Sequence, residues 1–302
     1  MTEPAVSLEF ATLEASLEER RRLVEGALRR VAGDAGRPVP GVGTAVEDSL
    51  HASAKRVRPI LALLVTETLR GDVSAVLPAA CAVELVHTAS LILDDLPCMD
   101  DAAVRRGRPA CHVAHGEASA LLAAFALQNR AYGILAEGWD KSPDAAVRTA
   151  MARELAEAVG LQGMIAGQAM DLAQTGSSLD FPTLEFIHSR KTGALFIASA
   201  RIGALGARAR PAETAAVSAY AKNLGLAFQV VDDLIDATGG DEAGKDVGKD
   251  ARKTTFVSFA GVPGARQLAQ ELIVASQEAL TPFGPRARLL RDRARYVVTR
   301  RR

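Results

Sequence analysis

The sequence predicts an all-α protein whose long helices surround a central active-site cavity. Its 302 residues are rich in Ala, Leu, Glu and Arg, and aromatic residues make up only 4%. Apolar residues recur at helical spacing almost throughout, whereas the alternating pattern of strands is scarce. No repeat of fixed period, low-complexity tract or long linker divides the chain. We therefore expect one domain over residues 1–302, built as a single large helical bundle.

Breaks in the periodicity separate predicted helices of roughly 10 to 25 residues. The breaks fall at 33–43, around 143, and at 175–182, 239–250 and 261–264. Pro59 suits the first turn of one helix, where its missing N–H would have no helical partner. The apolar stretch before Asp94 predicts another helix, which must end or kink by Pro97. Residues 229–236 lie on a third, with an acidic stripe between apolar positions.

Composition narrows the class of protein. Lys plus Arg and Asp plus Glu both number 36, so the net charge of zero gives no reason to expect nucleic acid or an anionic membrane as partner. The first 30 residues lack the apolar core of a signal peptide, and no run of 18 apolar residues predicts a membrane span. Cys81, Cys98 and Cys111 form no CxxC pair and indicate reduced thiols. We expect a cytoplasmic protein.

Two aspartate-rich clusters carry the predicted chemistry. The first contains Asp94, Asp95, Asp100 and Asp101, and the second contains Asp232, Asp233 and Asp236. Carboxylates packed this densely repel one another unless a cation lies between them. Hard oxygen ligands, few in each cluster, suit Mg²⁺ that keeps waters and also holds substrate phosphates. Two facing clusters would hold a diphosphate, which favours chemistry with diphosphate as the leaving group.

The two clusters differ in geometry. Gln229 and the second cluster occupy positions i, i+3, i+4 and i+7, so they share one helix face. A lone DDxxD is more often a solvated acidic face, but the apolar flanks and the presence of a second cluster favour a functional site. Asp94 and Asp100 would be about 240° apart on an ideal helix. We therefore expect the chain after Asp94 to bulge and bring the second pair back toward the metals.

Basic residues outside the clusters form a candidate phosphate-binding set. They are Lys55, Arg58, Arg105, Arg106, Lys191, Lys245 and Lys253. Any one of them is more often a surface charge, but together they would supply Arg forks and Lys point charges to phosphate oxygens. His87 lies two turns before Asp94 on the same face, and structural and functional interpretations of it stay open.

Several motifs, in this order, resemble those of the trans-isoprenyl diphosphate synthase family. They are Lys55-x-x-Arg58-Pro59, His87, residues 94–106, residues 163–172, Lys191-Thr192, residues 228–236, and Gly244-Lys245 followed by Lys253. The resemblance runs from about residue 45 to about residue 260 and returns at the C-terminus. It implies head-to-tail condensation of isopentenyl diphosphate with an allylic diphosphate, which is dimethylallyl, geranyl or farnesyl diphosphate.

The resemblance also implies a role for each motif residue. About three Mg²⁺ would be bound by Asp94, Asp95, Asp100, Asp232, Asp233 and Asp236, with Asp171 in support. The diphosphate of isopentenyl diphosphate would be held by Lys55, Arg58, His87 and Arg106. The allylic diphosphate would be held by Arg105, Lys191, Lys245 and Lys253. Thr192, Gln168 and Gln229 would lie beside the reacting carbons. The enzyme is expected to be a homodimer.

Product length is expected to depend on the helix before Asp94. Ala89 and Ser90 lie about one turn before that residue. In the resembling family an aromatic side chain there stops growth at 15 carbons, so two small residues predict geranylgeranyl diphosphate, with 20 carbons. Products of 15 or 25 carbons remain alternatives. Phe125 stands where the family commonly has Asp and is a candidate for part of the tunnel floor.

Two other classes of protein share part of this pattern. A class I terpene cyclase also ionises an allylic diphosphate with Asp-bound Mg²⁺, but it needs no second diphosphate site. Lys55, Arg58 and Arg106 therefore count against a cyclase. A non-catalytic subunit of a heteromeric synthase would be expected to lose one acidic cluster, and both are intact here.

Overall fold

The computed structural model describes residues 3–33, 39–174, 176, 178–238 and 254–299. The N-terminal part contains α1 (Glu3–Gly33), α2 (Val42–His51), α3 (Val57–Thr68), α4 (Val73–Asp94), α5 (Cys111–His115), α6 (Glu117–Glu137) and α7 (Ala145–Val159). The C-terminal part contains α8 (Met164–Ala173), α9 (Phe181–His188), the π-helix η1 (Ser189–Gly193), α10 (Ala194–Gly206), α11 (Pro211–Thr238), α12 (Phe256–Ala279), the 3₁₀ element η4 (Thr281–Ala287) and α13 (Arg288–Thr299). Between α4 and α5, the strands β1 (Val104–Arg105) and β2 (Arg108–Pro109) form a small antiparallel hairpin. The all-α prediction is confirmed.

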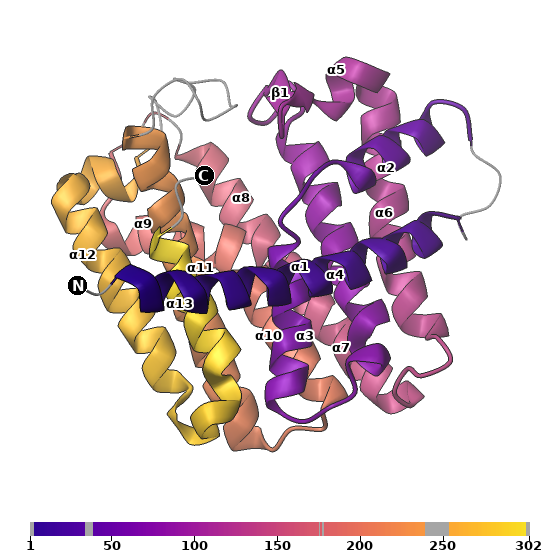
Figure 1. Cartoon of the computed structure of the whole chain (residues 1–302). Helices are drawn as coiled ribbons and strands as arrows, with labels where there is room; N and C mark the ends of the chain where they lie inside the picture. The colour runs from indigo at the N-terminus through magenta and orange to yellow at the C-terminus, as the bar shows by residue number, and fades with distance from the viewer. Residues whose placement is uncertain (1–2, 34–38, 175, 177, 239–253, 300–302) are drawn as a thin grey trace.

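The helices enclose two adjoining apolar cores. One gathers around α4, α6 and α7, and the other around α11, α12 and α13. Helices α3 and α10 contribute side chains to both cores and pack against each other. Gly203 permits this approach, because a Cβ there would lie 2.4 Å from the carbonyl oxygen of Ala62. Helix α1 crosses the front of the bundle and contacts α2, α3, α4 and α13 (Figure 1).

Helix α4 is the most apolar of the long helices. Its length and composition alone would let it cross a membrane, but 72% of its most apolar window is buried within the protein. Such burial is what a central core helix requires, because every face of it meets apolar neighbours.

The predicted breaks that fall on described residues match the structure with two differences, and the predicted break at 239–250 lies outside the described residues. Helices α1 and α11 contain 31 and 28 residues, more than expected, because no residue inside them interrupts the periodicity strongly enough. The break at 261–264 is a kink within α12 rather than a loop, where Gly261 has φ 70° and Pro263 follows. Helix α4 ends at Asp94, before Pro97, as the sequence predicts.

Candidate active site

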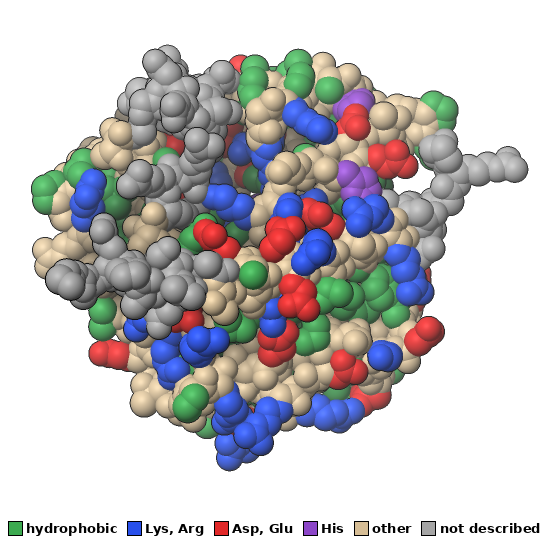
Figure 2. All heavy atoms as spheres, viewed as in Figure 1, with side chains coloured by type: hydrophobic (Ala, Val, Ile, Leu, Met, Phe, Trp, Pro, Cys, Tyr) green, Lys and Arg blue, Asp and Glu red, His purple; other side chains and the backbone are tan. Residues whose placement is uncertain are grey.

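Two acidic walls face one cavity of about 500 Å³. On one side α4 ends at Asp94, and the next residues turn back so that the N–H of Asp100 donates to the carbonyl oxygen of Asp94, 2.9 Å away. The predicted bulge is therefore present, and it brings both carboxylates to the cavity. On the other side α11 contributes Asp232 and Asp236. Figure 2 shows acidic and basic side chains side by side around a hollowed part of the upper face.

The cavity suits a divalent cation. Burial raises the pKa of Asp94 to about 6, the nearby Lys191 lowers it, and Asp100 raises it again. A carboxylate with a raised pKa is a destabilised negative charge, which a bound cation would relieve. The available donors are carboxylate oxygens, which Mg²⁺ prefers. Among the described residues no three His, Cys, Asp or Glu side chains form a ready-made cage.

Asp95 and Asp233, two of the predicted metal ligands, each contact groups of the protein. The Asp95 carboxylate pairs with Arg105, is 2% exposed and lines a separate cavity of about 210 Å³ instead of the main one. A residue next to Asp94 is rotated about 100° from it at the end of a helix, which explains why the two diverge. Asp233 lines the main cavity but accepts hydrogen bonds from Gln229 Nε2 at 3.0 Å and from the Phe256 N–H at 2.9 Å. Asp95 and Asp233 thus help to hold the two walls in place, and the metal-ligand set of Asp94, Asp95, Asp100, Asp232, Asp233 and Asp236, with Asp171 in support, stays a prediction.

Lys191 lies on the π-helix η1 and is held by Asp171 of α8. Its Nζ donates to Asp171 Oδ2 at 2.8 Å, and both side chains line the cavity. π-Helical turns often occur at functional sites because they re-aim side chains. Gly167 of α8 lies against this turn so closely that a Cβ there would be 2.2 Å from the Lys191 backbone nitrogen. In this arrangement Asp171 holds the Lys191 side chain in the cavity wall.

Three neutral polar side chains line the cavity, as predicted. Thr192 Oγ1 donates to Gln229 Oε1 at 3.1 Å, which continues the chain of bonds to Asp233. The amide atoms of Gln168 are shielded from solvent and have no hydrogen-bond partner within the described part of the chain. An unpaired buried amide is costly, so its place in the cavity wall indicates a ligand as the missing partner.

The basic residues divide between the main cavity and two smaller neighbours. Arg58 and His87 line the main cavity, and Arg58 Nη1 lies 3.0 Å from His87 Nε2. Burial lowers the pKa of Arg58 to about 10 and, with help from Arg58, holds the pKa of His87 well below its ordinary value. His87 is therefore neutral and accepts from Arg58. Lys55 lines a cavity of about 490 Å³ beside Phe228, and Arg106 lines the small cavity behind Asp95.

Arg105 borders both the main cavity and the small one, and its pairing with Asp95 fixes it between them. Lys245 and Lys253, which the sequence also predicts for the allylic diphosphate, lie outside the described residues.

The far part of the cavity is apolar and narrow. Ala89 and Ser90 line it, as predicted. Phe125 does not, because its side chain on α6 is 62% exposed and points away from the cavity. The α6 residue that reaches the cavity is Gln128. It lies four residues after the buried Ala124, on the same helix face, so helical spacing was a signal that could have identified it.

Comparison with known proteins identifies the family of this chain. Residues 40–274 match the profile of the polyprenyl synthetase family. The chain belongs to this family. It is 41% identical over 266 residues to geranylgeranyl pyrophosphate synthase 9 of Arabidopsis thaliana, covering 85% of this chain and 73% of the relative. It is 39% identical over 272 residues to farnesyl diphosphate synthase of Geobacillus stearothermophilus, covering 89% and 91%.

Solved structures of other polyprenyl synthetases share the fold. An FPP/GFPP synthase from Zymomonas mobilis superimposes with a TM-score of 0.83 at 35% identity, covering 95% of this chain and 99% of that one. A geranyltransferase from Legionella pneumophila gives 0.86 at 30% identity, covering 96% and 98%. The resemblance to trans-isoprenyl diphosphate synthases is confirmed, and this polyprenyl synthetase is a prenyltransferase.

Proposed function

We propose that this prenyltransferase joins isopentenyl diphosphate head to tail with allylic diphosphates, and that its main product is geranylgeranyl diphosphate. One observation carries the proposal: two facing acidic walls and a separate pair of basic groups, Arg58 and His87, border one cavity. The arrangement offers places for two diphosphates. A terpene cyclase needs only one, and a non-catalytic subunit needs neither wall.

The residues suit distinct tasks in the reaction. Asp94, Asp100, Asp232 and Asp236 would hold about three Mg²⁺, which neutralise charge on the departing diphosphate. Lys191 and Arg105 bind the allylic diphosphate and stabilise the same developing charge. Thr192, Gln168 and Gln229 direct amide and hydroxyl dipoles at the allylic cation. The apolar walls exclude water, which would quench that cation. The departing diphosphate takes up the proton that the condensed product loses as its new double bond forms.

Product length rests on the side chains along the tunnel. Ala89 and Ser90 leave it open one turn below Asp94, which favours growth past 15 carbons. A product of 15 carbons remains the second candidate, because Gln128, Val159 and Met164 border the same cavity further on.

The direct test is product analysis. Wild-type protein is incubated with Mg²⁺, labelled isopentenyl diphosphate and each allylic starter in turn, and the products are sized by chromatography. We expect a 20-carbon product from each starter. Asp232→Ala is the negative control and should give no product. A cyclic hydrocarbon formed without isopentenyl diphosphate would establish the cyclase instead.

We further propose that the enzyme is a homodimer in the cytoplasm. Helix α6 exposes three large apolar side chains, Leu121, Leu122 and Phe125, at 40%, 55% and 62%. A contiguous apolar face on a helix favours burial against a partner, and a second copy would cover both faces at once. Light scattering should give the mass of a dimer for the wild type and a shift toward monomer for Phe125→Ser. A monomeric wild type would exclude the dimer.

A further inference from the structure

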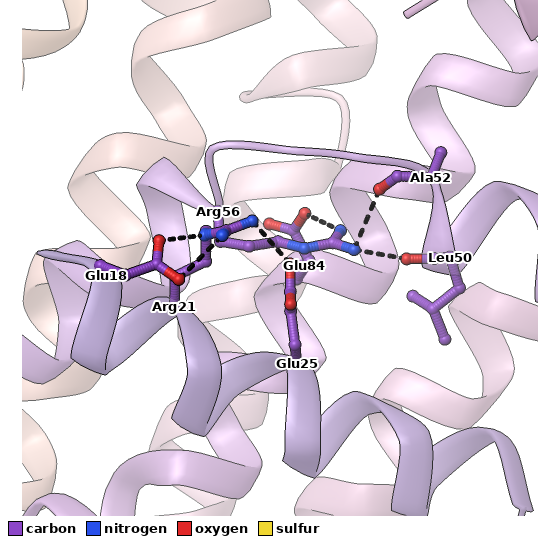
Figure 3. A network of polar contacts seen from close by, with 7 residues as sticks. All are labelled: Glu18, Arg21, Glu25, Leu50, Ala52, Arg56 and Glu84. Carbon is purple, nitrogen blue, oxygen red and sulfur yellow. Dashed lines mark hydrogen bonds and ion pairs between the residues drawn. The ribbon is translucent and has the colours of Figure 1, made fainter.

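A buried ion pair joins three helices next to the basic site. Arg56 Nη1 donates to Glu84 Oε1 at 2.7 Å, and each side chain is 1% exposed (Figure 3). Nη2 of the same guanidinium donates to the carbonyl oxygens of Leu50 at 2.5 Å and Ala52 at 3.3 Å, where α2 ends. Arg56 is the N-cap residue of α3, and Glu84 belongs to α4. One side chain therefore ties α2, α3 and α4 together.

This pair is poorly suited to stabilise the fold. The Arg56 Nε and Glu84 Oε2 atoms are buried without a hydrogen-bond partner among the described residues. Removing two charges from water is costly, and a buried ion pair replaced by apolar residues of similar size often leaves stability unchanged or higher. In some proteins such a pair is retained because it fixes one arrangement of its surroundings.

The surroundings of the pair are the basic groups of the site. Arg56 has the left-handed φ of 49°, so the backbone turns sharply between Lys55 and Arg58 and sends them to different cavities. Glu84 lies three residues before His87 on the same face of α4. The pair thus holds both sides of the 3.0 Å contact between Arg58 and His87.

A second tie holds the same turn from the opposite side. Arg293 of α13 is buried, and its Nη2 donates to the carbonyl oxygen of Val57 at 2.8 Å. Glu84 also affects the charged groups of the site. Burial lowers the pKa of Arg58 and the pKa of Arg106, and the Glu84 carboxylate raises both pKa values. Two of the expected diphosphate ligands therefore face the same buried counter-charge.

We propose that Arg56 and Glu84 are positioning residues for isopentenyl diphosphate: they touch no substrate and hold Arg58 and His87 in the arrangement that binds its diphosphate. The proposal rests on the proposed function. It assigns the pair to one of the two substrates, because Arg56 lies two residues before Arg58 and Glu84 lies one turn before His87, and none of the pair's hydrogen bonds reaches the acidic walls.

The main test replaces both charges with apolar groups of similar length. Arg56→Met/Glu84→Met should fold with an unchanged or higher Tm, raise the KM for isopentenyl diphosphate at least about tenfold, and leave the KM for geranyl diphosphate within about twofold. The matched control is Arg20→Met/Glu67→Met, which removes another Arg–Glu pair between helices, joined at 3.1 Å and 2.5 Å, that borders none of the three cavities. An unchanged KM for isopentenyl diphosphate in the folded Met pair overturns the proposal.

A second variant tests the proposal in case the Arg56→Met/Glu84→Met protein does not fold. Arg56→Lys keeps the charge but loses the fork that reaches Leu50 and Ala52. It should raise the KM for isopentenyl diphosphate in the wild type and have no further effect in an Arg58→Ala background, because its influence passes through Arg58. Fully additive effects overturn the proposal. An inactive wild type would refute the proposed function, whereas an active wild type with unaffected variants would refute only this inference.

Discussion

A carboxylate that lines the cavity and one that the protein already binds should respond differently to substitution. Asp94, Asp232 and Asp233 all border the cavity, but Asp233, like Asp95, also holds neighbouring groups in place. Loss of Asp94 or Asp232 should therefore affect chemistry more than folding, and loss of Asp95 or Asp233 should affect both.

Asp94→Asn should lower kcat at least about 10²-fold, as should Asp232→Ala, because each removes a ligand that helps to neutralise the leaving group. Although Asp94→Asn should lower kcat, it should not lower the stability of the folded protein. Since burial raises the pKa of this carboxyl from 3.8 to about 6, stability is lost as pH rises through that window, and the ionised group opposes folding at pH 7. In metal-free buffer at pH 7 the Tm should be equal to or above that of the wild type.

Kinetics with saturating Mg²⁺ and thermal melts with chelator measure the two effects of Asp94→Asn separately. Asp101→Asn is the matched control, because Asp101 belongs to the first cluster without lining the cavity and Asn tolerates its φ of 47°. Near wild-type turnover in folded Asp94→Asn would contradict the assignment of Asp94 as a ligand.

Substitution of Gln168 should also change activity and stability in different directions. Its amide atoms are buried without partners in the described part of the chain, so Gln168→Leu removes an unpaired polar group and should raise or preserve Tm. The same change removes a dipole from the cavity wall, and we expect kcat to fall roughly tenfold, equivalent to about 1.4 kcal/mol. Melting curves and steady-state kinetics test both. A variant that is less stable yet fully active would show that Gln168 is structural.

At the scale of elements, the close approach of α8 to η1 fixes where Lys191 and Thr192 lie. Gly167→Ala would place a Cβ 2.2 Å from the Lys191 backbone nitrogen, so the π-helical turn has to move. We expect lower Tm and a loss of kcat of at least about tenfold, since a small misplacement of positioning groups is costly.

Gly26→Ala provides the control for a change from glycine to alanine in a helix. A Cβ at Gly26 would meet no atom within 4 Å, so this substitution in α1 should stabilise the protein by about 0.5 to 1 kcal/mol without affecting activity. If Gly167→Ala behaved like this control, the contact between α8 and η1 would not constrain the site.

The elements also show what local sequence could and could not predict. Pro97 and the six-residue spacing from Asp94 to Asp100 predict the end of α4 and the turn that follows, because both depend on nearby residues alone. The partner of Asp233 could not be predicted, since the Phe256 N–H is 23 residues away and meets it only after α12 packs on α11. The Arg56–Glu84 pair was missed for the same reason, its residues being 28 positions apart.

Across the whole molecule, one cavity links the acidic walls to an apolar end enclosed by α4, α6, α7 and α8. Val86 and Ala89 come from α4, Gln128 from α6, Val159 from α7 and Met164 from α8. No single helix therefore sets the room available to the growing chain, and the identity of the α6 residue could not be read from the motif pattern.

Ala89→Tyr should shift the main product from 20 to 15 carbons, because an aromatic ring there would fill the tunnel about one turn, or roughly 6 to 7.5 Å, below Asp94. Chromatography of products made from geranyl diphosphate, with isopentenyl diphosphate in excess, measures the shift. Phe125→Ser tests the opposite expectation: this side chain lies on the outer face of α6, so its loss should leave product length unchanged. A wild type that already stops at 15 carbons, or an Ala89→Tyr variant with unchanged products, would mean that the chain grows along another path. A shorter or longer product from Phe125→Ser would instead mean that the outer face of α6 reaches a tunnel, as it could only through a second copy of the chain.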